Sequence, residues 1–445
     1  MRPLEKIYRD SVHNIIRVNT GTDEGRLIVA LIDTPEFQRL RRIRQLGLAY
    51  FAYQSAEHSR FTHSLGAFHL AARMIAKLRV TYDISPEAQT AVRVAALLHD
   101  IGHGPFSHVI ESILDFHHER FTVEAVLSSE TEVGRLLRGY SSQLARDVAD
   151  IISGDFRHRA LGQLVSSQLD VDRMDYLLRD SLMTGAKYGV FDLEWIIKSI
   201  EINEADDHLY VSAAGIYAVE DYLQARYYMY RQVYFHRTLR SAEAVLRLLL
   251  RRAIYLTKTG GDVWKPDGSP MNKVLAGEKL GLREHLEIDD ADFLFCIKRW
   301  QHSSDVILSD LAGRFLNRKL FKAYDLDMPE ADRLSFIDES RNVVAGAGFD
   351  PDYYFVEDKA GNAPYSFYST ETDAKELIFV EDGFSRPVIR EISSVSPAVR
   401  GLQEGYRVHR ICFPAEVKEK IAGLYHTDGK DLNAKTQRRR AAKKS

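Results

Sequence analysis

Hydrophobic and polar residues alternate with a helical period over the first half of the chain. The segments 37–46 and 65–75 place apolar residues three or four positions apart, and 92–98 is apolar on nearly all sides, as in a helix buried at the centre of a domain. Pro35 follows Asp33 and Thr34, either of which can cap a helix N-terminus. We therefore expect a short β or extended entry over residues 1–30, with its alternation at 15–19, and then helices from about residue 33 to residue 255.

The pattern changes after residue 256. Turn-forming residues fill 257–275, and helical spacing resumes at Ala291–Tyr324. Four later segments (352–357, 365–369, 376–380 and 406–411) are rich in aromatic and β-branched residues, which predicts strands, and Ala415–Tyr425 predicts a closing helix. The expected fold is mostly α: a helical core at 1–256, a helical extension at 257–330, a smaller α+β lobe at 331–425, and a basic, disordered tail at 426–445.

Composition narrows the class of protein. The 445 residues are 45% hydrophobic and include 60 Lys+Arg against 63 Asp+Glu, so the chain is globular and has no excess of positive charge with which to coat nucleic acid. The two cysteines, Cys296 and Cys412, make neither a disulfide framework nor a zinc finger. Because there is no signal-peptide pattern and no apolar stretch long enough to span a bilayer, we expect a cytoplasmic protein without a membrane partner.

The pattern of the 16 histidines carries the chemistry. An adjacent pair, His99 and Asp100, ends the most apolar predicted helix, with His63 on an earlier helix and Asp172 on a later one. Imidazole and carboxylate groups are ligands for Mn, Fe, Zn or Mg, and four ligands from three helices leave coordination positions open, as a catalytic metal requires. Alternatively, His99 caps the helix C-terminus and Asp100 begins the next turn.

Longer strings carry a resemblance to a known family. The strings are 32–47, 60–66, 99–108, 118–119 and 170–180, in that order along the chain. They resemble the HD-domain metal-dependent phosphohydrolases, and within them the deoxynucleoside triphosphate triphosphohydrolases, which include bacterial dGTPases and the vertebrate SAM-and-HD-domain dNTP hydrolase. The resemblance implies an HD-domain helical core, here expected without a SAM domain, and a divalent metal ion on His63, His99, Asp100 and Asp172.

The resemblance also implies catalytic residues near the α-phosphate. His108 would protonate the leaving 5′-oxygen, a task that suits a histidine because its ordinary pKa lies near neutral pH. His103, His118 and Glu119 would line the same pocket, with Glu119 orienting His118. The alternative for His103 and His108 is a structural role as turn residues in a Gly-Pro loop.

A further set of residues would bind the substrate. Arg60 matches the arginine that holds the α-phosphate, and Arg226 one that holds the γ-phosphate, since guanidinium groups bind phosphate oxygens in pairs. Gln45 and Leu46 match residues that recognise the 3′-hydroxyl and leave no room for a 2′-hydroxyl, and Tyr234 matches an aromatic that packs on the sugar. Matches at the phosphate and sugar end are Arg173, Tyr176 and Asp180. Core packing is the alternative for the other aromatics of 227–235.

Regulation and assembly follow from the resemblance. One segment of the related enzymes binds a guanine effector between subunits, and it is matched here by Asp33, Gln38 and Arg41. The effector would be GTP, dGTP or another dNTP. A helix cap at Asp33 and a surface position for Arg41 are the alternatives, and the segment 209–215 lacks the basic residues of the vertebrate enzyme's second effector segment. The implied assembly is a homo-oligomer, a tetramer or another closed form; the alternative is a monomer with a satellite lobe.

The leading functional hypothesis is hydrolysis of a dNTP, with dGTP the first candidate, to deoxynucleoside and inorganic triphosphate. A second hypothesis keeps the metal but changes the substrate to another phosphoester, such as a nucleotide second messenger or single-stranded nucleic acid. A third is a nucleotide-sensing scaffold without catalysis. The residues Gln45, Leu46 and Tyr234 favour a deoxyribonucleotide, and the intact ligand set favours an enzyme.

Overall fold

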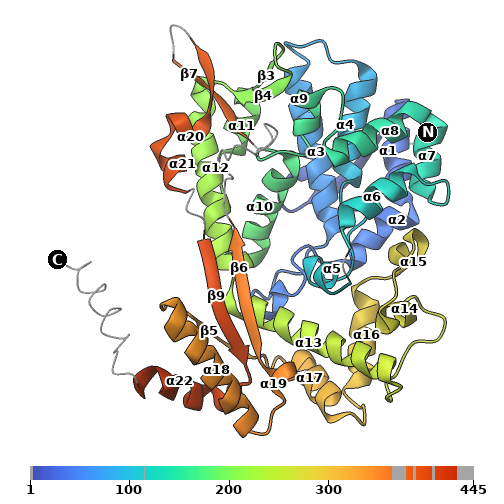
Figure 1. The fold of residues 1–445 in the computed structure, drawn as a ribbon. Coiled ribbons are helices and arrows are strands. Elements are labelled where there is room, and N and C mark those ends of the chain that lie inside the picture. The colour runs from blue at the N-terminus through green and yellow to red at the C-terminus, as the bar shows by residue number, and fades with distance from the viewer. Residues whose placement is uncertain (1–3, 115, 363–376, 384–386, 403–405, 428–445) are drawn as a thin grey trace. The chain divides into compact units, whose positions relative to one another are not determined.

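The computed structural model describes residues 4–114, 116–362, 377–383, 387–402 and 406–427 (Figure 1). The chain divides into two compact units. The first contains the chain up to His236 together with Trp264–Ile297 and Gly361–Tyr406; the second contains Arg237–Val263, Lys298–Ala360 and the chain from Arg407. These units do not follow the linear boundaries expected at 256, 330 and 425, because the chain leaves the first unit and later returns to it. The predicted basic tail lies almost entirely outside the described residues.

The first unit is mostly helical, as predicted. Its helices are α1 (Asp23–Asp33), α2 (Pro35–Arg39), α3 (Arg60–Leu78), α4 (Pro86–Leu98), α5 (His108–Leu114), α6 (His118–Leu127), α7 (Glu132–Tyr140), α8 (Ser142–Ser153), α9 (Arg159–Gln163), α10 (Val171–Thr184), α11 (Leu193–Ser199), α12 (Ile216–Met229), α14 (Met271–Ala276), α15 (Leu282–Glu287), most of α16 (Asp290–Trp300), α20 (Ile392–Val395) and α21 (Pro397–Gly401). Short 3-10 turns lie at Leu40–Arg42, Ala49–Phe51 and Ala213–Gly215, and a π-helical turn, Tyr230–Tyr234, follows α12.

Three packed helices form the centre of this unit. Helix α4 begins with the Ser85 hydroxyl accepting a hydrogen bond from the Ala88 amide and with Pro86 in its first turn, as a capped helix should. Its apolar residues are buried on nearly all sides, as predicted. Helix α3 packs against both α4 and α10. The helices expected to carry the metal ligands are therefore neighbours in space (Figure 1).

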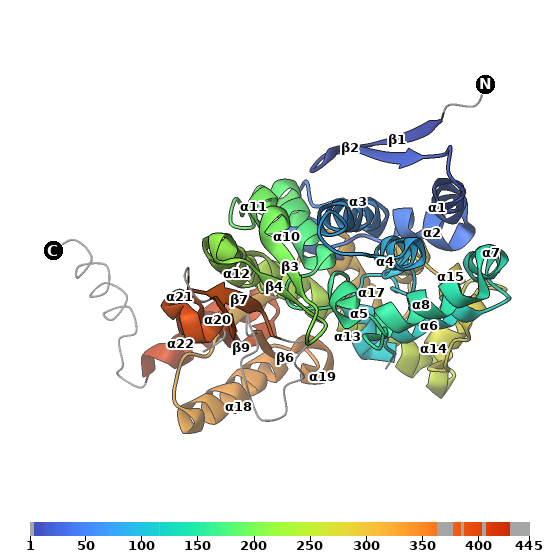
Figure 2. The ribbon, with the colours of Figure 1, turned by 90° about the horizontal axis from the view of Figure 1, so that it is seen from above.

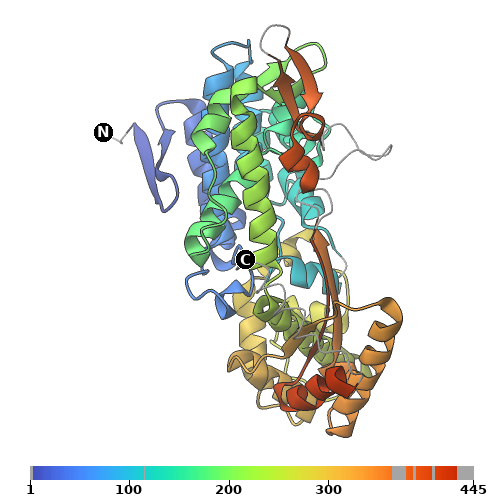
Figure 3. The same cartoon turned by 90° about the vertical axis from the view of Figure 1, so that its left-hand side faces the viewer.

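A two-stranded hairpin precedes these helices and confirms the first part of the extended entry, but the prediction was wrong from Asp23 onward, where α1 begins. Strand β1 (Glu5–Asp10) pairs antiparallel with β2 (Asn14–Asn19). Ile16 and Val18 of β2 are buried, whereas β1 is largely exposed. In Figures 2 and 3 the hairpin stands at one edge of the first unit, and β2 contacts α1 and α3.

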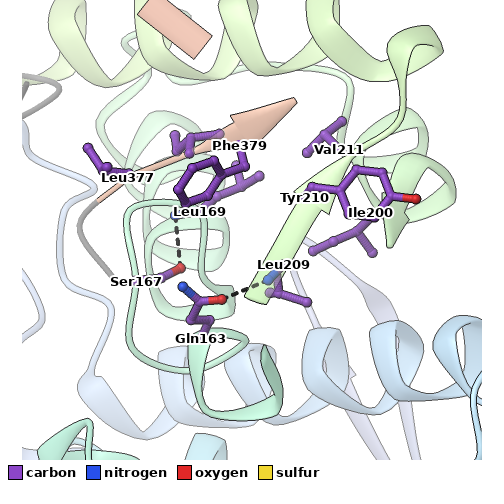
Figure 4. A pocket seen from close by; sticks show the side chains of 10 residues that line it. Gln163, Ser167, Leu169, Ile200, Leu209, Tyr210, Val211, Leu377 and Phe379 are labelled. Carbon is purple, nitrogen blue, oxygen red and sulfur yellow. Dashed lines mark hydrogen bonds between the residues drawn. The ribbon is translucent and has the colours of Figure 1, made fainter. Parts of the chain in front are cut away.

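A small sheet interrupts the stretch that was expected to be wholly helical. Strands β3 (Ile200–Asn203) and β4 (His208–Val211) pair with each other, and β4 pairs in parallel with β7 (Phe379–Asp382), which pairs with β8 (Val388–Glu391). Figure 4 shows a pocket where β4 and β7 meet. There the Gln163 side chain accepts a hydrogen bond from the Leu209 amide at 2.8 Å. None of the residues lining this pocket is a predicted site residue.

The second unit contains helices and a three-stranded sheet. Its elements are α13 (Arg237–Thr259), α17 (Val306–Leu316), β5 (Lys322–Asp325), α18 (Glu330–Gly346), α19 (Pro351–Tyr354), β6 (Val356–Asn362), β9 (Tyr406–Phe413) and α22 (Lys418–Thr427), with the sheet in the order β5-β9-β6. The strand expected at 406–411 and the closing helix are present here, and the strand expected near 376–380 is β7 of the first unit. The strand expected at 365–369 lies outside the described residues.

One sequence prediction for the later part of the chain was wrong, and another was right in part. The segment 352–354 is the short helix α19, because the Asp350 side chain caps it and Pro351 fills its first turn; the strand β6 begins at Val356. The helical pattern predicted for Ala291–Tyr324 is confirmed by α16 and α17, and only its last residues, from Lys322, belong to the strand β5. None of the helices among the described residues is long and apolar enough to cross a membrane.

Candidate metal centre and active site

The structure brings three of the predicted metal ligands into one cluster. His63 lies in the first turn of α3, His99 directly follows α4, and Asp172 lies in the first turn of α10. The Asp172 Oδ1 atom is 3.0 Å from His63 Nε2 and 3.5 Å from His99 Nε2, and the two Nε2 atoms are 3.2 Å apart. One donor atom from each residue lies within 4.8 Å of the others, a spacing that one ion can bridge.

The fourth predicted ligand, Asp100, lies beside this cluster. Its Oδ1 is 3.3 Å from His99 Nε2, and its Oδ2 is 3.7 Å from His63 Nε2. The Arg60 guanidinium donates to Oδ2 at 2.6 Å. Burial opposes ionisation of Asp100, but the charges of Arg60 and the two histidines lower its pKa to about 2. The carboxylate is therefore held ionised, as a metal ligand must be.

The donor set fits a divalent ion. Each ligand histidine uses its other ring nitrogen elsewhere: His63 Nδ1 bonds to Asp175 at 2.8 Å and His99 Nδ1 to the Ala96 carbonyl at 2.9 Å. Both Nε2 atoms are left with lone pairs that face each other, an arrangement that needs a cation or a proton between them. Burial opposes protonation of His63, yet hydrogen bonds to Asp172 and Asp175 raise its pKa to about 10. Imidazole and carboxylate donors suit Mn, Fe, Zn or Mg.

A second cluster adjoins the first. The rings of His103 and His118 stack with centroids 3.5 Å apart. Glu111 Oε1 lies 2.7 Å from His118 Nδ1 and 3.6 Å from His103 Nδ1, and His103 Nε2 lies 3.4 Å from Asp100. The predicted catalytic residues His103 and His118 thus meet beside the metal ligands.

The structure assigns the carboxylate partner of His118 differently from the sequence. Glu119 was expected to orient His118, but it is exposed on α6, because adjacent residues of a helix point in different directions. Glu111 of α5 makes that contact instead. His108, the predicted acid, begins α5, and its side chain lies outside the described part of the structure.

The loop that carries His103 is held in an unusual backbone conformation. Phe106 and Ser107 have φ values of 50° and 52°, a left-handed region that costs roughly 1–2 kcal/mol for residues other than glycine. The Asp290 carboxylate accepts a hydrogen bond from the Phe106 amide at 2.9 Å. The Ser107 hydroxyl accepts one from Arg60 Nη2 at 2.8 Å. The loop conformation therefore positions the predicted α-phosphate arginine.

A buried arginine holds the same loop from behind. Arg39 of α2 is almost completely buried and donates hydrogen bonds to the carbonyls of Ile101, His103, His285 and Ile288. Burial lowers the pKa of this guanidinium to about 10, so it remains charged at neutral pH. Arg39 thus ties α2 and the segment around α15 to the loop that carries His103.

The residues expected at the sugar lie next to the metal ligands. The Tyr234 hydroxyl donates to Asp180 Oδ2 at 2.8 Å, and Asp180 Oδ1 lies 2.7 Å from His58 Nε2. The Tyr176 ring is near both groups, with its centroid 6.3 Å from that of Tyr234 and 6.4 Å from that of His63. The π-helical turn at the end of α12 places Tyr234 in this group.

Two predicted substrate residues hold buried polar atoms without a hydrogen-bond partner among the described residues, namely Gln45 Oε1 and Arg226 Nε. Arg226 also donates to Gln168 through Nη1. Arg173 is paired with Asp170. Leu46, the remaining predicted substrate residue, is partly buried against the core. Buried polar atoms left without partners are costly unless a ligand satisfies them.

The predicted effector residues share one surface. Asp33 ends α1 and is exposed; Thr34, rather than Asp33, caps α2 by accepting a hydrogen bond from the Phe37 amide. The Gln38 side chain accepts one from Arg41 Nε at 2.8 Å, and the Arg41 guanidinium lies over the Phe61 ring at 3.5 Å. The helix-cap alternative for Asp33 is therefore wrong.

Comparison with known proteins identifies the family. The HD domain matches residues 60–180, and the HD-associated region matches residues 191–262. The uncharacterized protein YwfO of Bacillus subtilis is 38% identical over 420 residues, which cover 93% of each chain. A phosphohydrolase of known structure from Bacteroides thetaiotaomicron is 30% identical with a TM-score of 0.79, covering 92% of this chain and 99% of that one. The chain belongs to the HD-domain phosphohydrolase family.

A relative named for its substrate covers a smaller part of the chain. The deoxynucleoside triphosphate triphosphohydrolase SAMHD1 homolog of Dictyostelium discoideum is 32% identical over 261 residues, 55% of this chain and 49% of that protein. The chain thus spans about half the length of this relative. Part of this chain is therefore similar to a protein named as a dNTP hydrolase.

Sequence reasoning missed the residues that surround the HD ligands. Asp175, Arg179, His13 and Asp10 form a buried network behind His63. Asp175 and Arg179 stand in the matched string 170–180, where an (i, i+4) acid–base pair gives a weak signal. The contact between His13 and Asp175 joins positions 162 residues apart and has no local signal.

Proposed function

We propose that this protein hydrolyses dNTPs, with dGTP the first candidate, to deoxynucleoside and inorganic triphosphate. The observation that carries the proposal is the pair of adjoining groups described above: the His63, His99, Asp100 and Asp172 donor set, and the Tyr234–Asp180 pair beside it. The Dictyostelium relative's name supports the same substrate class.

Alongside the ion, two nearby arginines would bind the phosphates and stabilise their charge. A divalent ion on the donor set would supply Lewis-acid stabilisation of phosphate charge. Arg60 is already fixed by Asp100 and Ser107, so its guanidinium can meet an α-phosphate without reorganisation. Arg226, with its buried unpartnered Nε, would bind the γ-phosphate.

Proton transfer would use the second cluster. A water would attack the α-phosphorus and leave its oxygen on the triphosphate, while the bond from phosphorus to the 5′-oxygen breaks. The 5′-oxygen would take a proton from His108, and the proton released by the water would restore His108. Glu111 would orient the ring of His118 through Nδ1 beside the phosphates. His103 adds a second imidazole beside Asp100. Glu119 has no part in this proposal because it is exposed.

Selection of the sugar would depend on close packing and on one amide. Tyr234 is fixed through its hydroxyl to Asp180, so its ring cannot swing away from a ribose 2′-hydroxyl. Leu46 supplies an apolar wall, and the buried Gln45 Oε1 offers an acceptor for the 3′-hydroxyl proton. A site built this way rejects a hydroxyl that it can neither fit nor bond.

Ion chromatography of the products tests the reaction. The full chain with Mn²⁺ and each dNTP should release tripolyphosphate; pyrophosphate with dNMP would refute the mechanism. Asp172→Ala should abolish release while the circular dichroism spectrum is kept, and Asp83→Ala, a change of an exposed aspartate, should not. Faster turnover of rNTPs, cyclic nucleotides or single-stranded DNA would refute the substrate class.

Regulation belongs to the same proposal. Asp33, Gln38 and Arg41 together present a carboxylate, an amide and a guanidinium, which match the donors and acceptors of guanine. We expect a closed homo-oligomer that GTP or dGTP stabilises by mass action. Multi-angle light scattering with and without each nucleotide tests this; a fully active monomer under both conditions would refute the assembly and the shared effector site.

A further inference from the structure

The tip of the N-terminal hairpin is connected to the metal centre by buried hydrogen bonds. His13, in the turn between β1 and β2, directs Nε2 at Asp175 Oδ1, 2.7 Å away. The other Asp175 oxygen lies 2.8 Å from Nδ1 of the ligand His63. The side chains of His13, His63 and Asp175 are 3%, 0% and 0% exposed, so no bulk water stands between the hairpin and the ligand.

The charge state of Asp175 fixes the direction of these bonds. The Arg179 guanidinium donates to both oxygens of Asp175 at 2.9 Å, so this buried carboxylate is paired with a fixed positive charge. An ionised carboxylate only accepts. His63 therefore donates through Nδ1 and keeps its Nε2 lone pair for the metal, a tautomer that Asp175 sets.

The hairpin tip is itself organised around the same arginine. Arg179 donates to Asp175 through Nε and Nη2, both at 2.9 Å, and to Asp10 through Nη1 at 2.8 Å. Asp10 Oδ1 in turn accepts hydrogen bonds from the backbone amides of Val12 and His13, each at 2.9 Å. One buried carboxylate thus shapes the turn that presents the His13 ring.

Two further features show that the fold accommodates the contact between His13 and Asp175. At Gly66 of α3, an added Cβ would lie 1.8 Å from Asp175 Oδ1, so the glycine makes room for the carboxylate. The hairpin pairs with no other strand among the described residues, and a two-stranded hairpin is marginally stable by itself. Its docking therefore depends on the β2 side chains and on the polar contacts at its tip.

We infer that docking of the N-terminal hairpin and metal binding stabilise each other, with His13 as a positioning residue that acts on His63 through Asp175. This inference rests on the proposed metal centre. Because a coupling free energy is reciprocal, a hairpin contact that raises metal affinity requires that the metal raise the stability of the docked hairpin by the same factor. The hairpin thereby becomes a point from which the activity of the centre can be controlled.

The first experiment measures Mn²⁺ affinity by electron paramagnetic resonance of the free ion with the metal-depleted full chain. Substitution of residues behind a metal ligand weakens affinity by about 10–100-fold, and His13 acts one residue further away, so His13→Ala should weaken it by about tenfold. His13→Gln, whose Nε2 can still donate, should restore most of the affinity. Arg17→Ala, which alters an exposed residue of the same hairpin, should leave it unchanged.

The second experiment measures amide hydrogen exchange of residues 5–19 in the unaltered chain with and without Mn²⁺. We expect slower exchange when Mn²⁺ is bound. Equal Mn²⁺ affinity in His13→Ala and Arg17→Ala, or hairpin exchange that does not respond to Mn²⁺, would overturn the coupling while leaving the metal centre intact. Failure of the unaltered chain to bind Mn²⁺ would refute the metal centre and the coupling with it.

Discussion

His285 makes the loop that carries Gly102 and His103 sensitive to acid. Its side chain is fully buried on α15, its Nε2 donates to the Gly102 carbonyl at 2.7 Å, and its ring stacks on Phe121 with centroids 3.8 Å apart. Burial, together with the nearby charge of Arg39, lowers the pKa of His285 to about 3. Nδ1 is buried without a hydrogen-bond partner among the described residues, so a proton placed there would be uncompensated.

The direction of the pH effect follows from the two states. The unfolded chain protonates His285 below an ordinary pKa of about 6.5, whereas the folded chain resists protonation down to about 3. Folding stability from this residue is therefore complete above pH 6.5 and is lost progressively as the pH falls toward 3. At pH 5.0 the loss is roughly 2 kcal/mol of unfolding free energy.

Urea denaturation followed by far-UV circular dichroism, at pH 7.5 and pH 5.0, measures this loss. His285→Gln keeps the Nε2 donor and cannot be protonated, so its unfolding free energy should fall by about 2 kcal/mol less than that of the unaltered chain. His117→Gln, a change of an exposed histidine in the same unit, serves as the control. If His285→Gln and the unaltered chain lose the same stability on acidification, the reasoning about His285 is refuted.

Three other substitutions test the site. Gly66→Ala should lower both Mn²⁺ affinity and the free energy of unfolding, the latter by about 1–3 kcal/mol, because the methyl overlaps a buried carboxylate. The control Gly313→Ala, in open space within α17, should raise the free energy of unfolding by up to about 1 kcal/mol. Equal urea midpoints of the two variants would contradict this. Glu111→Gln should lower kcat by about 100-fold, with Glu119→Gln within about twofold of the unaltered enzyme; the reverse order in initial-rate assays would restore the sequence-based assignment. Arg39→Met should lower the free energy of unfolding by roughly 3 kcal/mol, because four buried carbonyls lose their donor. An unchanged thermal midpoint by calorimetry would show that these hydrogen bonds do not stabilise the fold.

How much of the site could be predicted depended on whether its residues lie in contiguous strings. His63, His99 and Asp172 each stand in a short motif, and the structure brings them together. Glu111 was missed because Glu119, next to His118, offered a simpler partner, and adjacency in a helix does not mean contact. His13 could not be predicted, since its partner is 162 residues away.

The fold could be predicted where the hydrophobic pattern was periodic. The prediction failed where local turn residues determined the structure. Helix α4 is apolar on nearly all sides and was predicted as a central helix. The segment 352–354 has strand-like composition, but Asp350 and Pro351 begin a helix there. Helix α18 was missed because its polar sequence carries little helical periodicity.

The hydrogen bonds from Arg39 to four carbonyls have a consequence for the synthesis of the protein. Two of its carbonyl partners, on His285 and Ile288, are 246 and 249 positions further along the chain. At roughly 5–20 residues per second, a ribosome needs on the order of 10–50 s to add that length. A nascent chain that already contains all four predicted metal ligands would therefore wait, with the Arg39 guanidinium still hydrated, for the segment that completes the loop. A fragment ending at residue 262, where the matched HD-associated region ends, would remain permanently in that waiting state.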